Sequence, residues 1–172
     1  ENAIDRMMAI RELPAKPFDR MITDVLYNVL TTDKFYGVRN EAAIALGKFK
    51  KNQVADVLMK AYDIQSHPKV KREILKALAN FKEEKVEKFI TRKIKDEKDD
   101  YIVSDGIDAL VKVCNPEDIY EYVKPFMKRE SHRNVVMGSV INALKISHKY
   151  KSDERIKTYF KEIAFGIDIP SR

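Results

Sequence analysis

Apolar side chains recur along the chain at the spacing of one helix face. Between residues 38 and 49 they stand at Val38, Ala42, Ala45, Leu46 and Phe49, separated from the first by 4, 7, 8 and 11 residues. Because an α-helix turns once every ~3.6 residues, these positions fall on one side of a helix. Sustained alternation of apolar and polar residues, which would indicate a half-buried strand, is missing from the sequence. The pattern therefore predicts helices.

The same apolar pattern returns at a nearly constant interval, which predicts a repeat protein. Val70, Ile74, Ala77, Leu78 and Phe81 follow the first set by 32 residues. Two later copies and a degenerate first copy are formed by Ile102, Gly106, Ala109, Leu110 and Val113, by Val136, Val140, Ala143 and Leu144, and by Arg6, Ala9, Ile10 and Leu13. We expect a single domain over residues 1–172, with approximate repeats 1–32, 33–65, 66–98, 99–130 and 131–172.

Each copy also contains a second helical segment after a short polar turn. The expected second helices are Phe18–Thr32, Asn52–Ile64, Glu84–Glu97, Pro116–Arg129 and Asp153–Phe165. Pro68 and Pro116 stand at expected first helical positions, where the missing N–H of proline costs no hydrogen bond. Asp33 and Asp153 are expected N-caps, because a carboxylate can accept from the first free backbone N–H groups of a helix.

One amphipathic helix pair cannot bury both of its apolar faces, so the copies are expected to stack on one another. Small residues at matching positions would let neighbouring helices approach closely. These residues are Ala42, Ala45, Ala77, Gly106, Ala109 and Gly138. The predicted fold class is all-α, a right-handed α-α superhelix of about five helical hairpins and ten helices.

The second copy resembles a known repeat family. It reads Val38-Arg39-Asn40-Glu41-Ala42-Ala43-Ile44-Ala45-Leu46-Gly47 after Asp33, which is similar to the HEAT pattern Val-Arg-x-x-Ala-x-x-Ala-Leu-Gly. This resemblance, strongest from Asp33 to Val113, implies a HEAT/armadillo-like solenoid. More particularly, Asp33-Lys34-Phe35-Tyr36-Gly37-Val38 looks like the start of a hairpin in the C-terminal helical domain of M1-family zinc aminopeptidases. Residues 2–13 also resemble the segment upstream of it.

This narrower resemblance implies a parent enzyme whose catalytic zinc domain lies upstream of Glu1. The zinc-binding motif of that family, His-Glu-x-x-His, and its Gly-x-Met-Glu-Asn segment do not occur in this sequence. We therefore expect a non-catalytic fragment without a cofactor of its own, which covers the substrate chamber of the parent or acts as a scaffold. The start at Glu1, directly before a helical pattern, also leads us to expect a piece of a longer chain.

Positive charge is concentrated in the middle of the sequence. From Lys48 to Lys98 there are 15 Lys and Arg against 8 Asp and Glu, whereas the whole chain has a net charge of +6. The candidate anion or partner surface consists of Lys48, Lys50, Lys51, Lys88, Arg92 and Lys95. Such a surface could attract an acidic protein, a peptide or nucleic acid. An ordinary solvated helix face with Glu–Lys pairs is the competing interpretation.

Arg39 and Lys71 occupy equivalent positions in two successive copies. In HEAT-type repeats the basic residue at this position often bridges neighbouring repeats through an Asp or a carbonyl. The planar fork of an arginine side chain suits several acceptors at once. The resemblance therefore implies a structural ladder of Arg39 and Lys71, which Val103 and Met137 do not continue.

The residue types that carry catalysis are sparse. His67, His132 and His148 are isolated from one another in the sequence, whereas a zinc site needs about three converging ligands. Cys114 is the one cysteine, so it forms no internal disulfide, and a reducing, cytoplasmic location is the simplest expectation. The acidic run from Asp96 to Asp100 lacks the Gly-centred spacing of a calcium loop. No apolar stretch approaches the ~18 residues of a membrane span.

Three functions stay open at this point. The first is the non-catalytic domain of an aminopeptidase-like protein, packed against an upstream domain of the same chain. The second is a stand-alone HEAT-repeat adaptor that binds a protein or peptide along the surface of the second helices. The third is a HEAT-like DNA-binding or DNA-repair protein, which would need aromatic stacking beside a nucleic-acid groove. Trp is absent from the sequence, which disfavours the third function.

Overall fold

The computed structural model describes residues 2–127 and 134–165, and it confirms the all-α prediction. Ten α-helices, two short 3-10 helices and no strand occur in these residues. Their bounds are α1 Ala3–Glu12, η1 Leu13–Ala15, α2 Arg20–Thr32, α3 Tyr36–Lys48, α4 Asn52–Ile64, α5 Pro68–Leu78, α6 Glu84–Lys95, α7 Asp100–Val113, α8 Ile119–Val123, η2 Lys124–Phe126, α9 Asn134–Tyr150 and α10 Glu154–Phe165.

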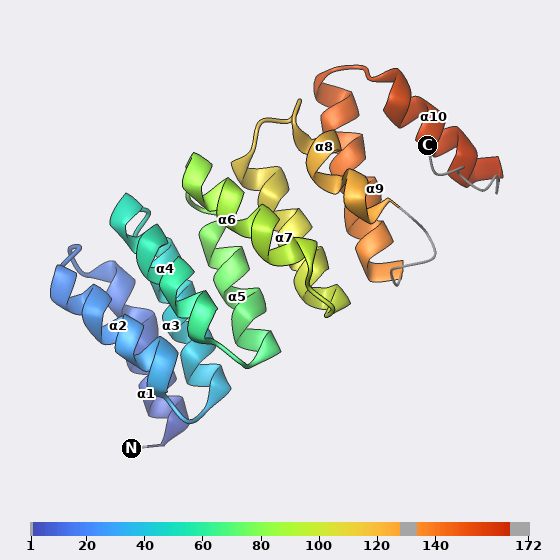
Figure 1. The fold of residues 1–172 in the computed structure, drawn as a ribbon. Helices are drawn as coiled ribbons and strands as arrows, with labels where there is room; N and C mark the ends of the chain where they lie inside the picture. The colour runs from blue at the N-terminus through green and yellow to red at the C-terminus, as the bar shows by residue number, and fades with distance from the viewer. Residues whose placement is uncertain (1, 128–133, 166–172) are drawn as a thin grey trace.

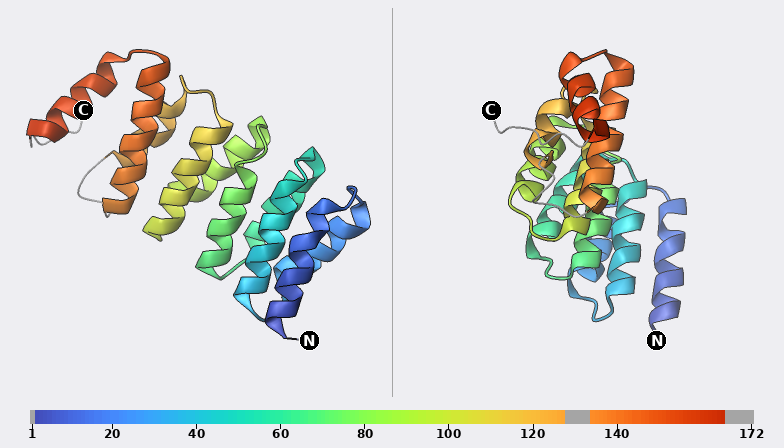
Figure 2. Two further views of the ribbon diagram at one scale, coloured as in Figure 1. Left: turned by 180° about the vertical axis from the view of Figure 1, so that it is seen from behind. Right: turned by 90° about the vertical axis from the view of Figure 1, so that its right-hand side faces the viewer.

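The helices form two layers of a stack. Helices α1, α3, α5, α7 and α9 pack side by side in the odd layer, and α2, α4, α6 and α8 follow one another in the even layer (Figure 1). The view from behind in Figure 2 shows the odd layer in front. Each even helix from α2 to α8 also packs closely against the odd helix that follows it. The right-handed sense of the superhelix remains a prediction.

The repeat interval places large apolar residues at equivalent points of both layers. One leucine row in the odd layer and one apolar row in the even layer are almost entirely buried; the residues are Leu46, Leu78, Leu110 and Leu144, and Leu26, Leu58 and Ile90. Full burial of such a side chain stabilises the fold by about 1.5–3 kcal/mol. One continuous core therefore runs through the stack, because successive repeats contribute apolar residues at equivalent positions.

Small residues let the helices approach closely at some of the predicted positions. Ala42, Ala45, Ala77 and Ala109 are buried. At Gly47 an added Cβ would lie 3.0 Å from the Cβ of Ala77, and at Gly106 it would collide with Ile94. The assignment of Gly138 to this seam is wrong, because no atom of the described residues lies within 4 Å of a Cβ built there. Gly138 is exposed, and no described helix contacts a Cβ at this position of α9.

One expected second helix differs from the prediction. The segment predicted as Pro116–Arg129 contains only the short helix α8, which begins at Ile119, followed by η2. Residues before it form a turn, in which the N–H of Asp118 donates to the carbonyl of Asn115. Pro125 cannot donate an intrahelical hydrogen bond and its ring disfavours a continuous helix, so the last turn tightens to 3-10 geometry. Arg129 lies outside the described residues.

The predicted helix starts have different outcomes. Pro68 is the first residue of α5, and Asp153 accepts from the N–H of Arg155 at the start of α10, so both predictions are confirmed. Asp33 is not the N-cap of α3, which begins at Tyr36. The Asp33 carboxylate instead accepts from Arg6 at 2.9 Å and from the N–H of Phe35, and it therefore shapes the turn between α2 and α3.

Candidate interaction surface

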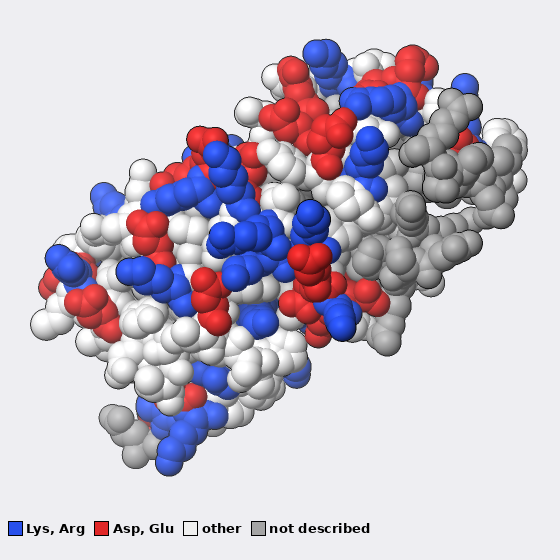
Figure 3. All heavy atoms as spheres, viewed as in Figure 1, with Lys and Arg blue, Asp and Glu red and all other residues white. Residues whose placement is uncertain are grey.

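The predicted basic residues lie in two separate places. Lys48 ends α3, and Lys50 and Lys51 form the turn to α4, whereas Lys88, Arg92 and Lys95 lie along α6; all six side chains are exposed. Figure 3 looks onto the even layer and shows Lys and Arg gathered over its middle, with Asp and Glu between them. The structure therefore divides the predicted surface into a turn group and an α6 group.

The turn group contains a backbone constraint. Lys50 has a φ of 50° and lies in the left-handed region, directly after the end of α3. Helices often end in this conformation, but usually at glycine, because a Cβ disfavours it. The position of the Lys50 side chain is thus set by helix termination.

Lys88 of the α6 group lies 2.5 Å from Glu84 on the same helix. Two further lysines of α6 are neutralised by carboxylates of α4. Lys85 lies 2.9 Å from Asp56, and Lys93 lies 2.6 Å from Asp63, so both residues link α6 to α4. The hydrogen bond with Asp56 raises the pKa of Lys85 above its ordinary value. Exposed ion pairs of this kind contribute about 0–1 kcal/mol each. Their main effect here is on the pattern of surface charge, since they remove two of the cations from it.

Arg39 and Lys71 make different contacts. Arg39 donates to the side-chain oxygen of Gln65 at 3.3 Å, and Gln65 in turn donates to the carbonyl of Leu30 at 2.7 Å. Arg39 is therefore connected to the preceding repeat through Gln65. The ammonium of Lys71 lies 5.4 Å from the ring centroid of Tyr62. This cation–π contact joins α5 to α4 without a carboxylate.

A row of carboxylates crosses the odd layer, and the sequence analysis missed it. Glu41, Glu73 and Asp105 recur at intervals of 32 residues on α3, α5 and α7. Arg11 lies 2.5 Å from Glu41, and Arg72 lies 2.6 Å from Asp105. These pairs join residues 30 and 33 positions apart, which is close to one repeat. The recurrence of an acidic residue at the same position of three copies was the signal for this row.

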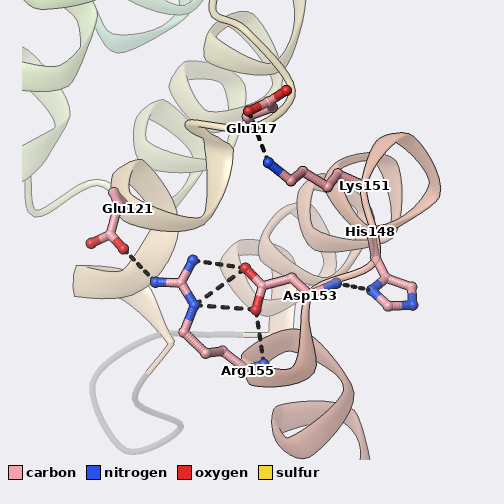
Figure 4. A network of polar contacts seen from close by, with 6 residues as sticks. All are labelled: Glu117, Glu121, His148, Lys151, Asp153 and Arg155. Carbon is pink, nitrogen blue, oxygen red and sulfur yellow. Dashed lines mark hydrogen bonds and ion pairs between the residues drawn. The ribbon is translucent and has the colours of Figure 1, made fainter.

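A polar network holds the last two helices at the C-terminal end (Figure 4). The guanidinium of Arg155 lies 2.7 Å from Asp153 and 2.7 Å from Glu121. Lys151 lies 3.5 Å from Glu117, on the other side of a polar hollow of about 330 Å³. Since the cations that line this hollow are paired with carboxylates, we interpret the network as a clamp between α8, α9 and α10.

The two described histidines, His67 and His148, make contacts that hold the fold together. The ring of His67 stacks on Tyr36, with centroids 4.6 Å apart and an interplanar angle of 7°. The Nδ1 atom of His148 accepts from the N–H of Asp153 at 3.2 Å. His132 lies outside the described residues. Within the described residues no three His, Cys, Asp or Glu side chains converge on a position where they could hold a metal ion.

Cys114 and the acidic run from Asp96 to Asp100 also contribute to the fold. Cys114 is buried, and burial raises the pKa of its thiol to about 12, so the reactive thiolate is disfavoured. Glu97 accepts from the N–H groups of Lys98 and Asp99, and Asp99 caps α7 through the N–H of Tyr101. These two carboxylates of the acidic run therefore form the turn between α6 and α7.

An apolar face is uncovered at the N-terminal end of the stack. Ile4 and Met8 on α1 are 67% and 60% exposed, and Met21 and Val25 on α2 are 68% and 51% exposed. We call these four residues the end face. One repeat later, the positions of Ile4, Met8 and Val25 are occupied by Tyr36, Asn40 and Val57, all of which are half-buried. These positions are therefore partly covered inside the stack, whereas the four residues of the end face are exposed among the described residues.

No protein-family model matches the chain, and no curated protein matches it either. Within the described residues, no helix has the length and the apolar character needed to span a bilayer.

Proposed function

We propose that this chain is a non-catalytic helical-repeat domain that works by packing its end face against a neighbouring domain. More particularly, we propose the C-terminal domain of an M1-type metallo-aminopeptidase or of a relative, where it would cover the substrate chamber or act as a scaffold. The observation that carries the proposal is the end face itself. A repeat stack needs a polar terminal surface when it ends in water, and Ile4, Met8, Met21 and Val25 form the opposite kind of surface.

The position of the end face supports this proposal. Its residues lie on both layers, at i and i+4 positions of α1 and of α2, so they form two parallel apolar stripes. One repeat later, the positions of Ile4, Met8 and Val25 are half-buried, whereas the position of Met21 is occupied by the exposed Gln53. A neighbouring domain that presents a helix or a helix pair would continue the same packing.

The aminopeptidase assignment is supported by the sequence resemblance of residues 2–13 and 33–43. These segments correspond to α1 and to the turn and first half of α3, which lie next to each other at the N-terminal end of the stack. No catalytic residue is assigned to this chain. In this proposal the zinc belongs to the parent enzyme, and the location is cytoplasmic because of the single cysteine.

The test is the intact mass of the native polypeptide that contains this segment, with the zinc content of the same sample. The segment alone has a mass of 20.0 kDa. A mass several times larger with about one zinc per chain is expected for a zinc aminopeptidase. A native chain near this mass without zinc would contradict the proposal and favour a stand-alone adaptor.

A photo-crosslinking residue at position 25 tests the role of the end face separately. In the purified native protein we expect cross-links from position 25 to another part of the same chain. The control is the same residue at position 112, an exposed lysine on α7 in the odd layer. Equal cross-linking from both positions would contradict a specific contact of the end face.

A further inference from the structure

The even layer carries a cation at the same place in three successive repeats. Lys60 on α4, Arg92 on α6 and Lys124 in η2 follow one another at intervals of 32 residues, and all three are exposed. Lys60 and Arg92 stand at the same offset from the first residues of their helices, Asn52 and Glu84. Helices α4 and α6 pack against each other, and packed helices lie about 8–10 Å apart, so Lys60 and Arg92 are separated by a step of about this size. Lys124 continues the row one repeat further along the even layer.

These three cations have no carboxylate within ion-pair distance among the described residues. The acidic residues that flank Lys60 on α4 are Asp56 and Asp63, and both are already bound by Lys85 and Lys93. The guanidinium of Arg92 lies 5.8 Å from the ring centroid of Phe89. The row therefore presents positive charge that the stack itself does not neutralise.

We propose that Lys60, Arg92 and Lys124 form a docking row for an extended acidic segment of a polypeptide. In the extended polyproline II conformation a chain has three residues per turn and rises about 3.1 Å per residue, so carboxylates three residues apart lie on the same side and are separated by about 9 Å. This spacing matches the step from one helix of the layer to the next. Each cation can then meet one carboxylate without bending the segment.

A polypeptide fits this row better than a nucleic acid does. A nucleic-acid strand carries a phosphate about every 3.4 Å of helix axis, about three times as densely as the cations of the row. Other lysines of the even layer, Lys85, Lys88 and Lys93, are paired with carboxylates and do not add free cations for the additional phosphates (Figure 3). Stacking of bases needs exposed aromatic rings. The exposed aromatic side chains of the described residues are Phe35, Tyr101, Tyr150 and Phe165, and all lie outside α4, α6 and η2.

The experiment is a fluorescence-anisotropy titration of a labelled peptide with Glu at every third residue and Gly or Ser between. We expect binding at low ionic strength that weakens with added salt. The triple variant Lys60→Gln, Arg92→Gln, Lys124→Gln is expected to bind about tenfold more weakly, which corresponds to about 1.4 kcal/mol shared by three exposed charge pairs. The control variant Lys112→Gln, Lys145→Gln, Lys149→Gln changes the net charge equally on exposed positions of the odd layer, and its affinity should stay unchanged.

Three outcomes would overturn the proposal. Equal loss of affinity in both triple variants would mean that net charge alone attracts the peptide. Equal binding of a peptide of the same composition with its Glu residues clustered would contradict the spacing of the row. Tighter binding of a single-stranded oligonucleotide of equal charge, lost in the first variant only, would assign the row to nucleic acid. Circular dichroism of each variant shows whether the fold is retained, and the result is independent of the mass and zinc content of the native chain.

Discussion

The middle of the stack and its C-terminal end differ in how much apolar packing accompanies their ion pairs. Helix α5 contributes five buried residues, and α7 contributes eight. Helix α10 contributes only Ile156 and Tyr159, and its last residue, Phe165, is 77% exposed. At that end, Arg155 and Lys151 form ion pairs with residues of the preceding repeat (Figure 4).

This difference matters because apolar and ionic contacts respond differently to conditions. Burial of apolar surface is not weakened by salt, whereas exposed ion pairs are screened within about 10 Å at 0.1 M ionic strength. In a repeat stack each unit contacts only its neighbours, so a weakly packed end can detach without unfolding the middle. We therefore expect the middle to set the global stability and α10 to set the local stability of the C-terminal end.

The largest effect is expected from a cavity in the middle. Leu78→Ala removes a fully buried side chain and should lower the free energy of unfolding by about 3 kcal/mol, measured by chemical denaturation. Ile156→Ala also removes a fully buried side chain, but in α10. Its cost in global unfolding should be clearly smaller, because α10 can detach first. Equal losses for the two variants would contradict the difference between the regions.

Two glycines sharpen the comparison between covered and uncovered helix faces. Gly106→Ala places a Cβ against buried Ile94 and should cost about 1–3 kcal/mol through overpacking. Gly138→Ala meets open space among the described residues and should stabilise α9 by up to about 1 kcal/mol, because alanine favours helix. Thermal melts of both variants measure the difference. A loss of stability in Gly138→Ala would show that this face of α9 is covered.

The sequence predicted the middle better than the C-terminal end for a physical reason. Periodicity alone predicted α4 with its observed bounds, because Val54 and Leu58 repeat at the helical spacing. The same reasoning extended the helix of the fourth repeat too far, since it gave no weight to Pro125. Gly138 was misplaced because the fourth copy follows the third after 34 residues, so Val140 and not Gly138 stands at the position of Gly106. The cross-repeat ion pairs were missed because partners 30–34 residues apart become neighbours only in the stack.

A smaller effect is expected at the end of α3. Lys50→Gly should stabilise the fold by about 0.5–1 kcal/mol, because glycine adopts the left-handed conformation of Lys50 without steric cost. The same substitution at Lys51, which has a φ of −105°, should destabilise slightly through the added freedom of the unfolded chain. Denaturation midpoints of the two variants should therefore move in opposite directions. Movement in the same direction would contradict this interpretation of the turn.

The smallest effect is expected on acidification. The hydrogen bond from Arg155 holds the pKa of Asp153 below its ordinary value of 3.8, so this contribution is present above that pH and is lost as the pH falls through the lowered pKa. Burial raises the pKa of Glu73 in the middle, so its protonation removes the cost of a partly buried charge. As the pH falls from 6 to 2.5, amide resonances next to Glu73 on α5 should shift first while the helix stays folded, and those of α10 should broaden only below pH 3.8. The reverse order would contradict the assignment.

The most direct test of this difference is amide hydrogen exchange, resolved by helix, at about 0.05 M and about 1 M salt. Helices α3 to α7 should show the slowest exchange, and salt should change their rates only slightly, because apolar packing outweighs their ion pairs. Helix α10 should exchange faster, and salt should accelerate it severalfold as the ion pairs of Arg155 and Lys151 are screened. Protection of α10 equal to that of α5, or an acceleration of α5 by salt as large as that of α10, would contradict a middle dominated by apolar packing and a C-terminal end that depends on ion pairs.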